Sequence, residues 1–433
     1  MLATLILLIG LFVLILLKIK AISFNFRCLF ALLLSLLAGM LIANINFSDF
    51  FVQLATLIGN GYIELLKMLI VPLVFVAIVH AIIHLRHYTQ GKIFQLVIIV
   101  VVALLLLTGI SAIIGGAIGQ VFHLGSQMTL PDSVQPQHTP TPLVETLLGM
   151  LPDNVIATTA DNNIIALVIF ASILGISTLT AYQKMPNETA ILIQLIDALF
   201  IIVKQMAQFI IALTPYGVFA LLTLTISQHG PHLISDLGSF ALAMYCAMML
   251  VLGLHTFIII LIGYNPFHYY RQAGQALLVA FSTRSSFGTL PVTMETLQKR
   301  LGASESVSNF APSIGATIGM NACAGIYPAI LVVMTLHMMG QPVTMETLLM
   351  VGFINMLASL GISGIPGTAF VAAGVTLSTL GLPFGAITLV QAIDPIIDMG
   401  RTATNINGVM TAALFADRFN RRKFDNKGIA NQS

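Results

Sequence analysis

Long apolar segments follow one another along almost the whole chain, and they restrict it to very few folds. Of its 433 residues 58% are hydrophobic and 8% are charged, whereas a soluble domain has about 25% charged residues. In hydrocarbon every backbone polar group needs an internal partner, so such segments cross a membrane as helices. We therefore predict an all-α polytopic membrane protein with spans at 2–17, 28–44, 52–85, 93–122, 164–182, 192–226, 237–262, 309–339 and 383–416.

The positive charges predict the orientation of these spans. Four of the 18 Lys and Arg residues lie inside apolar segments. All the others fall in loops that the order of spans places on one side, and none falls in 123–163, 227–236 or 338–345. Positive charge marks the cytoplasmic side, so we predict a cytoplasmic C-terminus. No positive charge precedes the first segment, whereas Lys18 and Lys20 follow it, so we interpret it as a spanning helix and not a signal peptide.

The last apolar segment contains a stripe of polar side chains. Asp394, Asp398, Arg401 and Asn405 follow the spacing i, i+4, i+7 and i+11, which places them on one face of a helix. A charge at the bilayer centre costs about 2.5–3.5 kcal/mol, so this face should line a cavity in the protein. A structural Asp–Arg pair between helices is the alternative. Four polar groups exceed what one tether needs, and we therefore predict a solute site.

Two other segments are too polar and too broken for ordinary spans. The first centres on 282–291, Ser-Thr-Arg-Ser-Ser-Phe-Gly-Thr-Leu-Pro, and the second contains 359–367, Ser-Leu-Gly-Ile-Ser-Gly-Ile-Pro-Gly. Each precedes a long span, and the predicted topology has them enter from opposite sides. Two re-entrant hairpins of opposite sense are typical of inverted repeats, which hold solute and ions where broken helices meet.

These stretches resemble the signatures of a known family. Residues 65–75, 282–291, 361–367 and 394–405 are similar, in the same order, to those of the dicarboxylate/amino acid:cation symporters, the glutamate-transporter superfamily. The resemblance covers about 27–418. It implies a homotrimer in a bacterial inner membrane, an elevator-type alternating-access mechanism, a scaffold at 27–268 and a transport core at 269–418. The helix within 1–26 and the cytoplasmic tail at 419–433 would be additions.

The resemblance also implies an amino-acid site. Asp398 would hold the α-amino group, Ser286 and Asn405 the α-carboxylate, and Arg401 the distal end of the side chain. The chemistry agrees, because a zwitterion needs an acceptor carboxylate and donors at opposite ends, and arginine recognises a further carboxylate with two prongs. The complete set of predicted substrate residues is Ser285, Ser286, Ser363, Gly364, Ile365, Asp398, Arg401, Thr402 and Asn405.

The cation sites should differ from those of the acidic amino-acid members. Where those members have Asn-Met-Asp-Gly-Thr, residues 319–323 read Gly-Met-Asn-Ala-Cys, and Val409 replaces an aspartate. Two carboxylates that would compensate bound cations are therefore missing. We expect coupling to sodium ions or protons and no other cofactor or metal. The predicted cation ligands, mostly through backbone carbonyls, are Gly315, Thr317, Ser359, Leu360, Ile362, Asp394 and Asn405.

The same departures favour one substrate. Asn321, Cys323 and the following 324–328, Ala-Gly-Ile-Tyr-Pro, are similar to the branch that takes up L-cystine in bacteria. Cystine has two amino-acid heads, so Arg401 would meet the carboxylate of the second head. Glutamate, aspartate or a dicarboxylate is the alternative substrate. Spacing alone predicts only an amino acid with a distal anionic group.

Two other functions were considered. Residues 361–364 fit Gly-x-Ser-Gly, the pattern of intramembrane serine proteases, which would need His255 or His337 near Ser363. A protease would leave the polar stripe at 394–405 without a function, so we do not predict an enzyme. A passive channel would be distinguished by its failure to concentrate solute. His80, His84 and His87 have helical spacing, and we interpret them as interfacial side chains and not as metal ligands.

Overall fold

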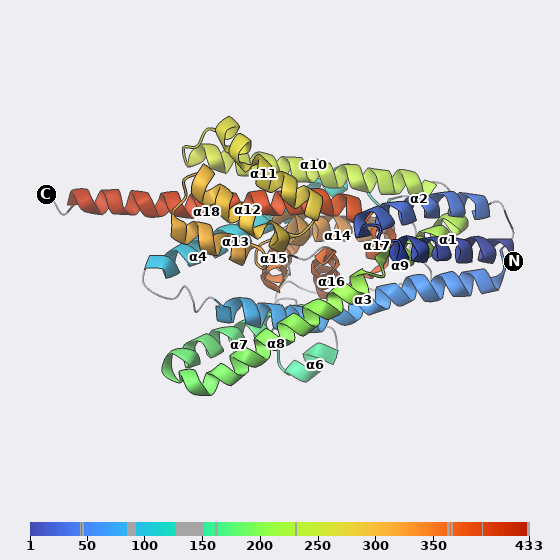
Figure 1. Cartoon of the computed structure of the whole chain (residues 1–433), viewed down its shortest axis with the longest axis horizontal. Helices are drawn as coiled ribbons and strands as arrows, with labels where there is room; N and C mark the ends of the chain where they lie inside the picture. Colours follow the sequence, from blue (N-terminus) through green and yellow to red (C-terminus); the bar gives the residue numbers. More distant parts are fainter. Residues whose placement is uncertain are drawn as a thin grey trace.

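The computed structural model describes residues 1–43, 45, 47–84, 92–126, 151–160, 163–229, 232–361, 364, 367–391 and 393–430, and every regular element in them is a helix (Figure 1). Eight helices in these ranges are long and apolar enough to cross a membrane. The predicted all-α membrane architecture is thus confirmed. These spans are Leu2–Ile19, Phe26–Ala43, Asp49–His84, Gln95–Val121, Ala166–Lys184, Pro186–Ile211, Ser235–Leu261 and Asn321–Met338.

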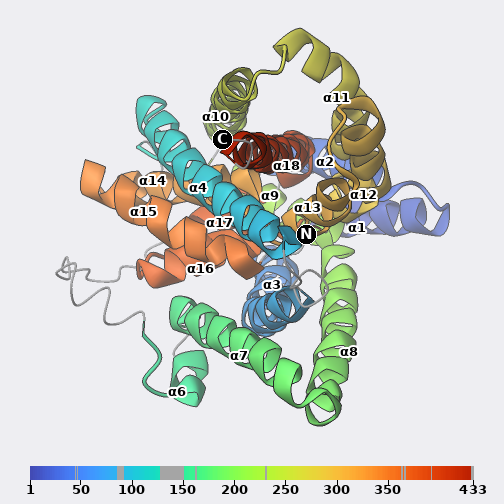
Figure 2. The same ribbon diagram turned by 90° about the vertical axis from the view of Figure 1, so that its left-hand side faces the viewer.

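The first helices pack as one group. Helices α1 (Leu2–Ile19), α2 (Phe24–Ala43) and α3 (Asp49–His84) contact α9 (Thr214–His229), with a core that includes Leu7, Phe51 and Phe219. Helices α7 (Ile164–Lys184) and α8 (Pro186–Ile211) also lie against α3. Both views show α7 and α8 on the side of the molecule opposite α10 and α11 (Figures 1 and 2). The short α6 (Val155–Ala160) precedes α7.

One predicted span, 192–226, is wrong as a single helix. The structure divides it into α8, which ends at Ile211, and α9, which begins at Thr214. Pro215 stands at the second position of α9. Proline is favoured in the first turn of a helix, where its missing N–H would have had no partner, and it cannot continue a preceding helix.

Both predicted hairpins are present. In the first, α11 (Pro266–Thr283) and α12 (Ser286–Glu295) meet at Arg284, whose φ of 54° is left-handed, and at Ser285, which caps α12. The π-helical turn η2 (Thr296–Arg300) follows α12. In the second, α15 (Met345–Ala358) continues into η4 (Ser359–Gly361), and α16 (Ala369–Thr379) returns along it.

The spans after the hairpins are interrupted, which corrects the prediction of two continuous helices. Residues 309–339 fall into α13 (Glu305–Gly315), the π-helical η3 (Asn321–Ile326) and α14 (Tyr327–Met338). Residues 383–416 fall into α17 (Gly385–Val390) and α18 (Asp394–Ala430). In the first break, Gly319 has a φ of +72° and its amide donates to the Ser359 carbonyl at 3.1 Å. The second hairpin thus satisfies backbone that the interrupted helix leaves free.

Helices α4 (Lys92–Val121) and α10 (His232–Leu261) lie against these last elements. α4 packs on η3, α14, α15 and α18, while α10 packs on α18 and α4. The predicted division between scaffold and transport core at residue 268 stays a prediction. Because α4 and α10 pack on the last elements, the structure favours assigning both helices to the transport core. The termini lie at opposite ends of the molecule, with the end of α18 extending past its neighbours (Figure 1).

Candidate functional site

The polar stripe of α18 forms a buried ion triad. Arg401 Nη2 donates to Asp394 Oδ1 at 2.6 Å and to Asp398 Oδ1 at 3.1 Å. The Arg401 side chain is 0% exposed, and its Cζ lies 4.4 Å from the centre of the Tyr327 ring. Buried charges of this kind need partners, and each of the three has one. The spacing therefore did place these groups on one face.

A small cavity lies beside the triad, between the hairpin tips and α18. Its volume is about 10 Å³, room for about one water molecule. Five of the predicted substrate residues line it, namely Ser286, Gly364, Asp398, Thr402 and Asn405. The structure thus brings together residues from α12, the second hairpin and α18, while their role in binding stays a prediction. Arg284, Met320, Cys323, Thr368 and Ala369 complete the lining.

These last five lining residues are not among the predicted substrate or cation residues. Met320 belongs to the unwound stretch before η3, and Thr368 and Ala369 lie at the start of α16. Only the neighbouring Gly367 and Asn321 gave a signal in the sequence. A side chain that faces a cavity from a non-helical stretch follows no helical spacing, so periodicity alone could not have found Met320.

Several predicted substrate residues lie elsewhere or cannot be placed. Ser285 does not line the cavity: its Oγ accepts from Gly288 N at 3.0 Å and donates to the Gly364 carbonyl at 3.3 Å. Ser363, Ile365 and the predicted cation ligand Ile362 lie outside the described residues. Ser285 is thus a helix cap that also ties the two hairpin tips together.

Arg401 is also absent from the cavity lining, because it lies among Asp394, Asp398 and Tyr327. Its Nε and Nη1 have no hydrogen-bond partner among the described residues. Unsatisfied guanidinium donors are costly when buried, so they are suited to an incoming carboxylate. The predicted contact with the distal end of a solute requires the guanidinium to become accessible from the cavity.

Asn405 joins α18 to the interrupted span. Its Oδ1 accepts from Ala322 N at 2.8 Å and Cys323 N at 3.4 Å, and its Nδ2 donates to Cys323 Sγ at 3.0 Å. The side chain therefore satisfies the first amides of η3. Asn405 also lines the cavity. A solute that binds Asn405 would therefore directly affect the hydrogen bonds that join α18 to η3.

The predicted cation ligands gather around the same break. Gly319 links it to Ser359, and the Thr317 hydroxyl donates to the Ile314 carbonyl at 3.0 Å. Leu360 lies in η4, next to Ser359, and Asp394 is held by Arg401. Backbone carbonyls can hold a sodium ion, and binding of one beside this break stays a prediction.

The position that would carry a cation-site carboxylate in the acidic members is filled with apolar atoms. Val409 is 1% exposed, and both of its methyl groups lie against Gly315. Asn321, at the other substituted position, donates to Thr108 Oγ1 at 3.3 Å and is 0% exposed. Asn407 points away from the cavity, where it accepts from the Tyr269 hydroxyl at 2.8 Å and lies 3.1 Å from His255 Nδ1. Protein atoms therefore pack around the two positions at which the acidic members carry cation-site carboxylates.

The close approach of the hairpin tips rests on Gly364. Its carbonyl accepts from Phe287 N and from Ser285 Oγ, both at 3.3 Å. A Cβ atom there would lie 2.6 Å from the Ala316 carbonyl oxygen and 2.8 Å from Ser286 Cβ. We expect Gly364→Ala to lower solute uptake by ~10-fold or more, because the added methyl group holds the tips apart.

Gly274→Ala is the matched control, because nothing lies within 4 Å of a Cβ at this position of the first hairpin. Uptake into vesicles and the thermal unfolding midpoint are measured for both variants. Uptake within twofold of the unmodified protein in a folded Gly364→Ala variant would contradict the role of this contact.

Comparison with known proteins identifies the family. Residues 24–419 match the sodium:dicarboxylate symporter family. The chain belongs to this family. The match contains every candidate site residue and begins after α1.

Relatives of similar length support the same assignment. The chain is 36% identical to the L-cystine uptake protein TcyP of Bacillus cereus in an alignment of 421 residues that covers 92% of this chain and 90% of that protein. It is also 38% identical to an uncharacterised symporter of Haemophilus influenzae over 379 residues, 83% of this chain and 85% of that one. These names point to a transporter and not to an enzyme. The two histidines considered for a protease, His255 and His337, are bonded to Asn407 and to the Leu124 carbonyl, respectively.

Proposed function

We propose that this symporter-family member imports L-cystine by secondary active transport. The observation that carries the proposal is the single cavity in which Asp398, Asn405 and Ser286 meet. A carboxylate suits an α-ammonium group, and amide and hydroxyl donors suit an α-carboxylate. The names of the Bacillus relatives support cystine as the solute.

Cystine also explains the buried arginine. One amino-acid head occupies the cavity, and the carboxylate of the other head meets the free Nε and Nη1 donors of Arg401. The cavity has a volume of about 10 Å³ and is lined by residues of both hairpin tips, so it must widen to admit this head. Entry of the solute requires the contacts of Gly364 with Ser285 and Phe287 to open. Movement of the core against the first helices would then provide elevator-type alternating access.

The proposal is tested with purified protein in liposomes that hold no solute. Labelled cystine, glutamate and aspartate are offered under imposed sodium or proton gradients, with protein-free liposomes as the control. We expect cystine to accumulate above its outside concentration. Faster accumulation of glutamate or aspartate would transfer the assignment to a dicarboxylate symporter, and equilibration without accumulation would indicate a channel.

The coupling ions form part of the proposal. We infer that fewer sodium ions move with each solute than in the acidic amino-acid members, with protons as the alternative. Val409 lies against Gly315, so no carboxylate compensates a cation there. Each sodium ion contributes about 2.3 kcal/mol per 100 mV plus its concentration gradient, so the driving force should be smaller.

We expect the reversal potential of the unmodified protein to give a stoichiometry below three sodium ions per solute. Val409→Asp should steepen the dependence of uptake on sodium concentration, because its carboxylate lies beside the Gly315 backbone. Val409→Asn has a similar shape and no charge, and it should not do so. A stoichiometry of three for the unmodified protein would show that the missing carboxylates are irrelevant.

The assembly and location are further parts of the proposal. The resemblance to the glutamate-transporter superfamily supports a homotrimer in the bacterial inner membrane with its C-terminus in the cytoplasm. Light scattering of the detergent-solubilised protein measures the number of chains, and a monomer mass would contradict the trimer.

A further inference from the structure

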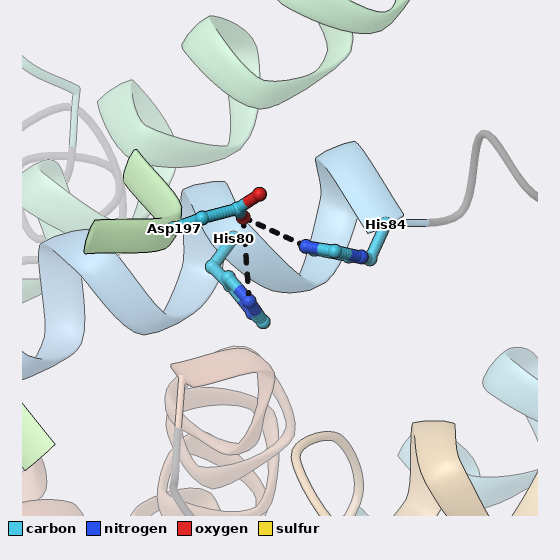
Figure 3. Close-up of side chains that lie close together, drawn as sticks. All are labelled: His80, His84 and Asp197. Carbon is cyan, nitrogen blue, oxygen red and sulfur yellow. Dashed lines mark hydrogen bonds and ion pairs between the residues drawn. The ribbon is translucent and has the colours of Figure 1, made fainter. Parts of the chain in front are cut away.

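A second cluster of polar side chains lies outside the lining of the cavity between the hairpin tips, where α3 contacts α8. His80 and His84 come from the last two turns of α3, and Asp197 comes from α8. Figure 3 shows both imidazole rings directed at the same carboxylate. His84 Nε2 lies 2.8 Å from Asp197 Oδ1, and His80 Nε2 lies 3.6 Å from that atom.

Spacing alone indicates interfacial histidines, but from the convergence on Asp197 we propose that His80, His84 and Asp197 bind a divalent transition-metal ion of the zinc class. Two imidazoles four residues apart on one helix, with a carboxylate from a neighbouring helix, form a donor set that zinc and similar ions prefer. The ligand atoms of the three residues lie within 4.8 Å of one another. Bonds of about 2.1 Å in a tetrahedral site separate ligand atoms by roughly 3.4 Å. The 3.6 Å separation is close to this value, and the 2.8 Å contact needs only a small opening.

The surrounding packing fixes the ligands before an ion arrives. The His80 ring stacks on Phe200 with centroids 4.0 Å apart and planes 17° apart. Phe200 follows Asp197 by one turn of α8, so one helix supplies both the carboxylate and the surface that orients the imidazole. The His84 ring lies 4.2 Å from the His80 ring. Little rearrangement is therefore needed for binding.

The cluster is partly open to its surroundings. The side chains of His80, His84 and Asp197 are 21%, 36% and 35% exposed, respectively. Three protein ligands and an accessible fourth position describe an exchangeable site and not a permanently closed one. The ion would fasten α3 to α8, both of which belong to the predicted scaffold. His87 lies outside the described residues and is not needed for the site.

Metal binding is measured directly on the purified full chain, prepared without a polyhistidine tag and treated with a chelator. We expect calorimetric titration with Zn²⁺ to give one saturable site per chain. Titration with Co²⁺ should give the visible absorption bands of a site with nitrogen ligands. Zinc should also raise the thermal unfolding midpoint, because an ion that binds only the folded chain stabilises it.

His84→Gln and Asp197→Asn should each weaken zinc binding by ~100-fold or more, because each removes one of three ligands. His268→Gln, which changes an exposed histidine on α11, is the matched control and should bind zinc like the unmodified protein. Equal zinc affinity in all four proteins, or no saturable binding in the unmodified protein, would overturn the proposal. This result does not depend on transport, so it is independent of the proposed solute.

Discussion

Asp398→Asn should reduce cystine uptake by roughly 30-fold to several-thousand-fold. Asp398 lines the cavity between the hairpin tips, its Oδ2 accepts from Gly367 N at 3.3 Å, and its Oδ1 accepts from Arg401 at 3.1 Å. Losing the charge-assisted bond to an α-ammonium group in a desolvated pocket costs about 2–5 kcal/mol, and about 1.4 kcal/mol corresponds to tenfold. The asparagine keeps the shape and one acceptor oxygen. Initial rates of cystine uptake in liposomes measure the effect.

The control for Asp398→Asn is Asp417→Asn. Asp417 is a buried aspartate on the same helix, where it accepts from Ser304 N at 3.3 Å, and it does not line the cavity. Its substitution also removes a buried negative charge, so it reports the general cost of such a change. We expect its uptake to stay within about threefold of the unmodified protein. If Asp398→Asn lowers uptake by less than threefold, the amino group binds elsewhere.

Arg401→Ala should abolish cystine uptake. The guanidinium offers two free donors to the distal carboxylate of cystine, and alanine offers none. Because a neutral amino acid has no distal carboxylate, its relative rate of uptake should increase. Uptake of labelled cystine, serine and alanine, each measured separately in the variant and the unmodified protein, reports this change in selectivity.

The alanine variant also leaves Asp394 and Asp398 without the cation that pairs with both of them. Breaking a buried pair costs about 3–5 kcal/mol, so the variant protein risks unfolding. Arg401→Lys keeps a positive charge near the aspartates and removes only the planar two-pronged donor. We expect it to fold and to lose at least tenfold in cystine uptake, about 1.4 kcal/mol. Normal cystine uptake by folded Arg401→Lys and Arg401→Ala proteins would refute the contact.

The sequence predicted the elements whose signals are local. Helical spacing placed Asp394, Asp398 and Arg401 on one face of α18, and the structure joins them in an ion triad. Clusters of Ser, Gly and Pro predicted both hairpins, because several such residues close together disfavour a continuous helix. The resemblance to the symporter family, and not these clusters, predicts Ser286 and Gly364 as substrate residues.

The breaks in the spans were not predicted, because long-range contacts stabilise them. The interruption before η3 depends on the Ser359 carbonyl and the Asn405 side chain, which come from the second hairpin and α18. From its sequence alone, an apolar stretch such as 309–339 is predicted to be one continuous helix, because the sequence does not show those long-range partners. The pairing of Asp197 with His84 was not predicted for the same reason, because the two residues are 113 positions apart in the sequence.

The sequence by itself thus determined the class of protein, the order of spans and hairpins, and the polar groups that share one face of α18. Hydrophobicity and helical periodicity act over a few residues, so they are legible without a structure. Only the tertiary structure decided that Arg401 pairs with Asp398 without lining the cavity. It also decided that Ser285 is a helix cap and that Val409 fills the space beside Gly315. These facts depend on which helices pack together, and burial gives a polar side chain its partners only after that packing is fixed.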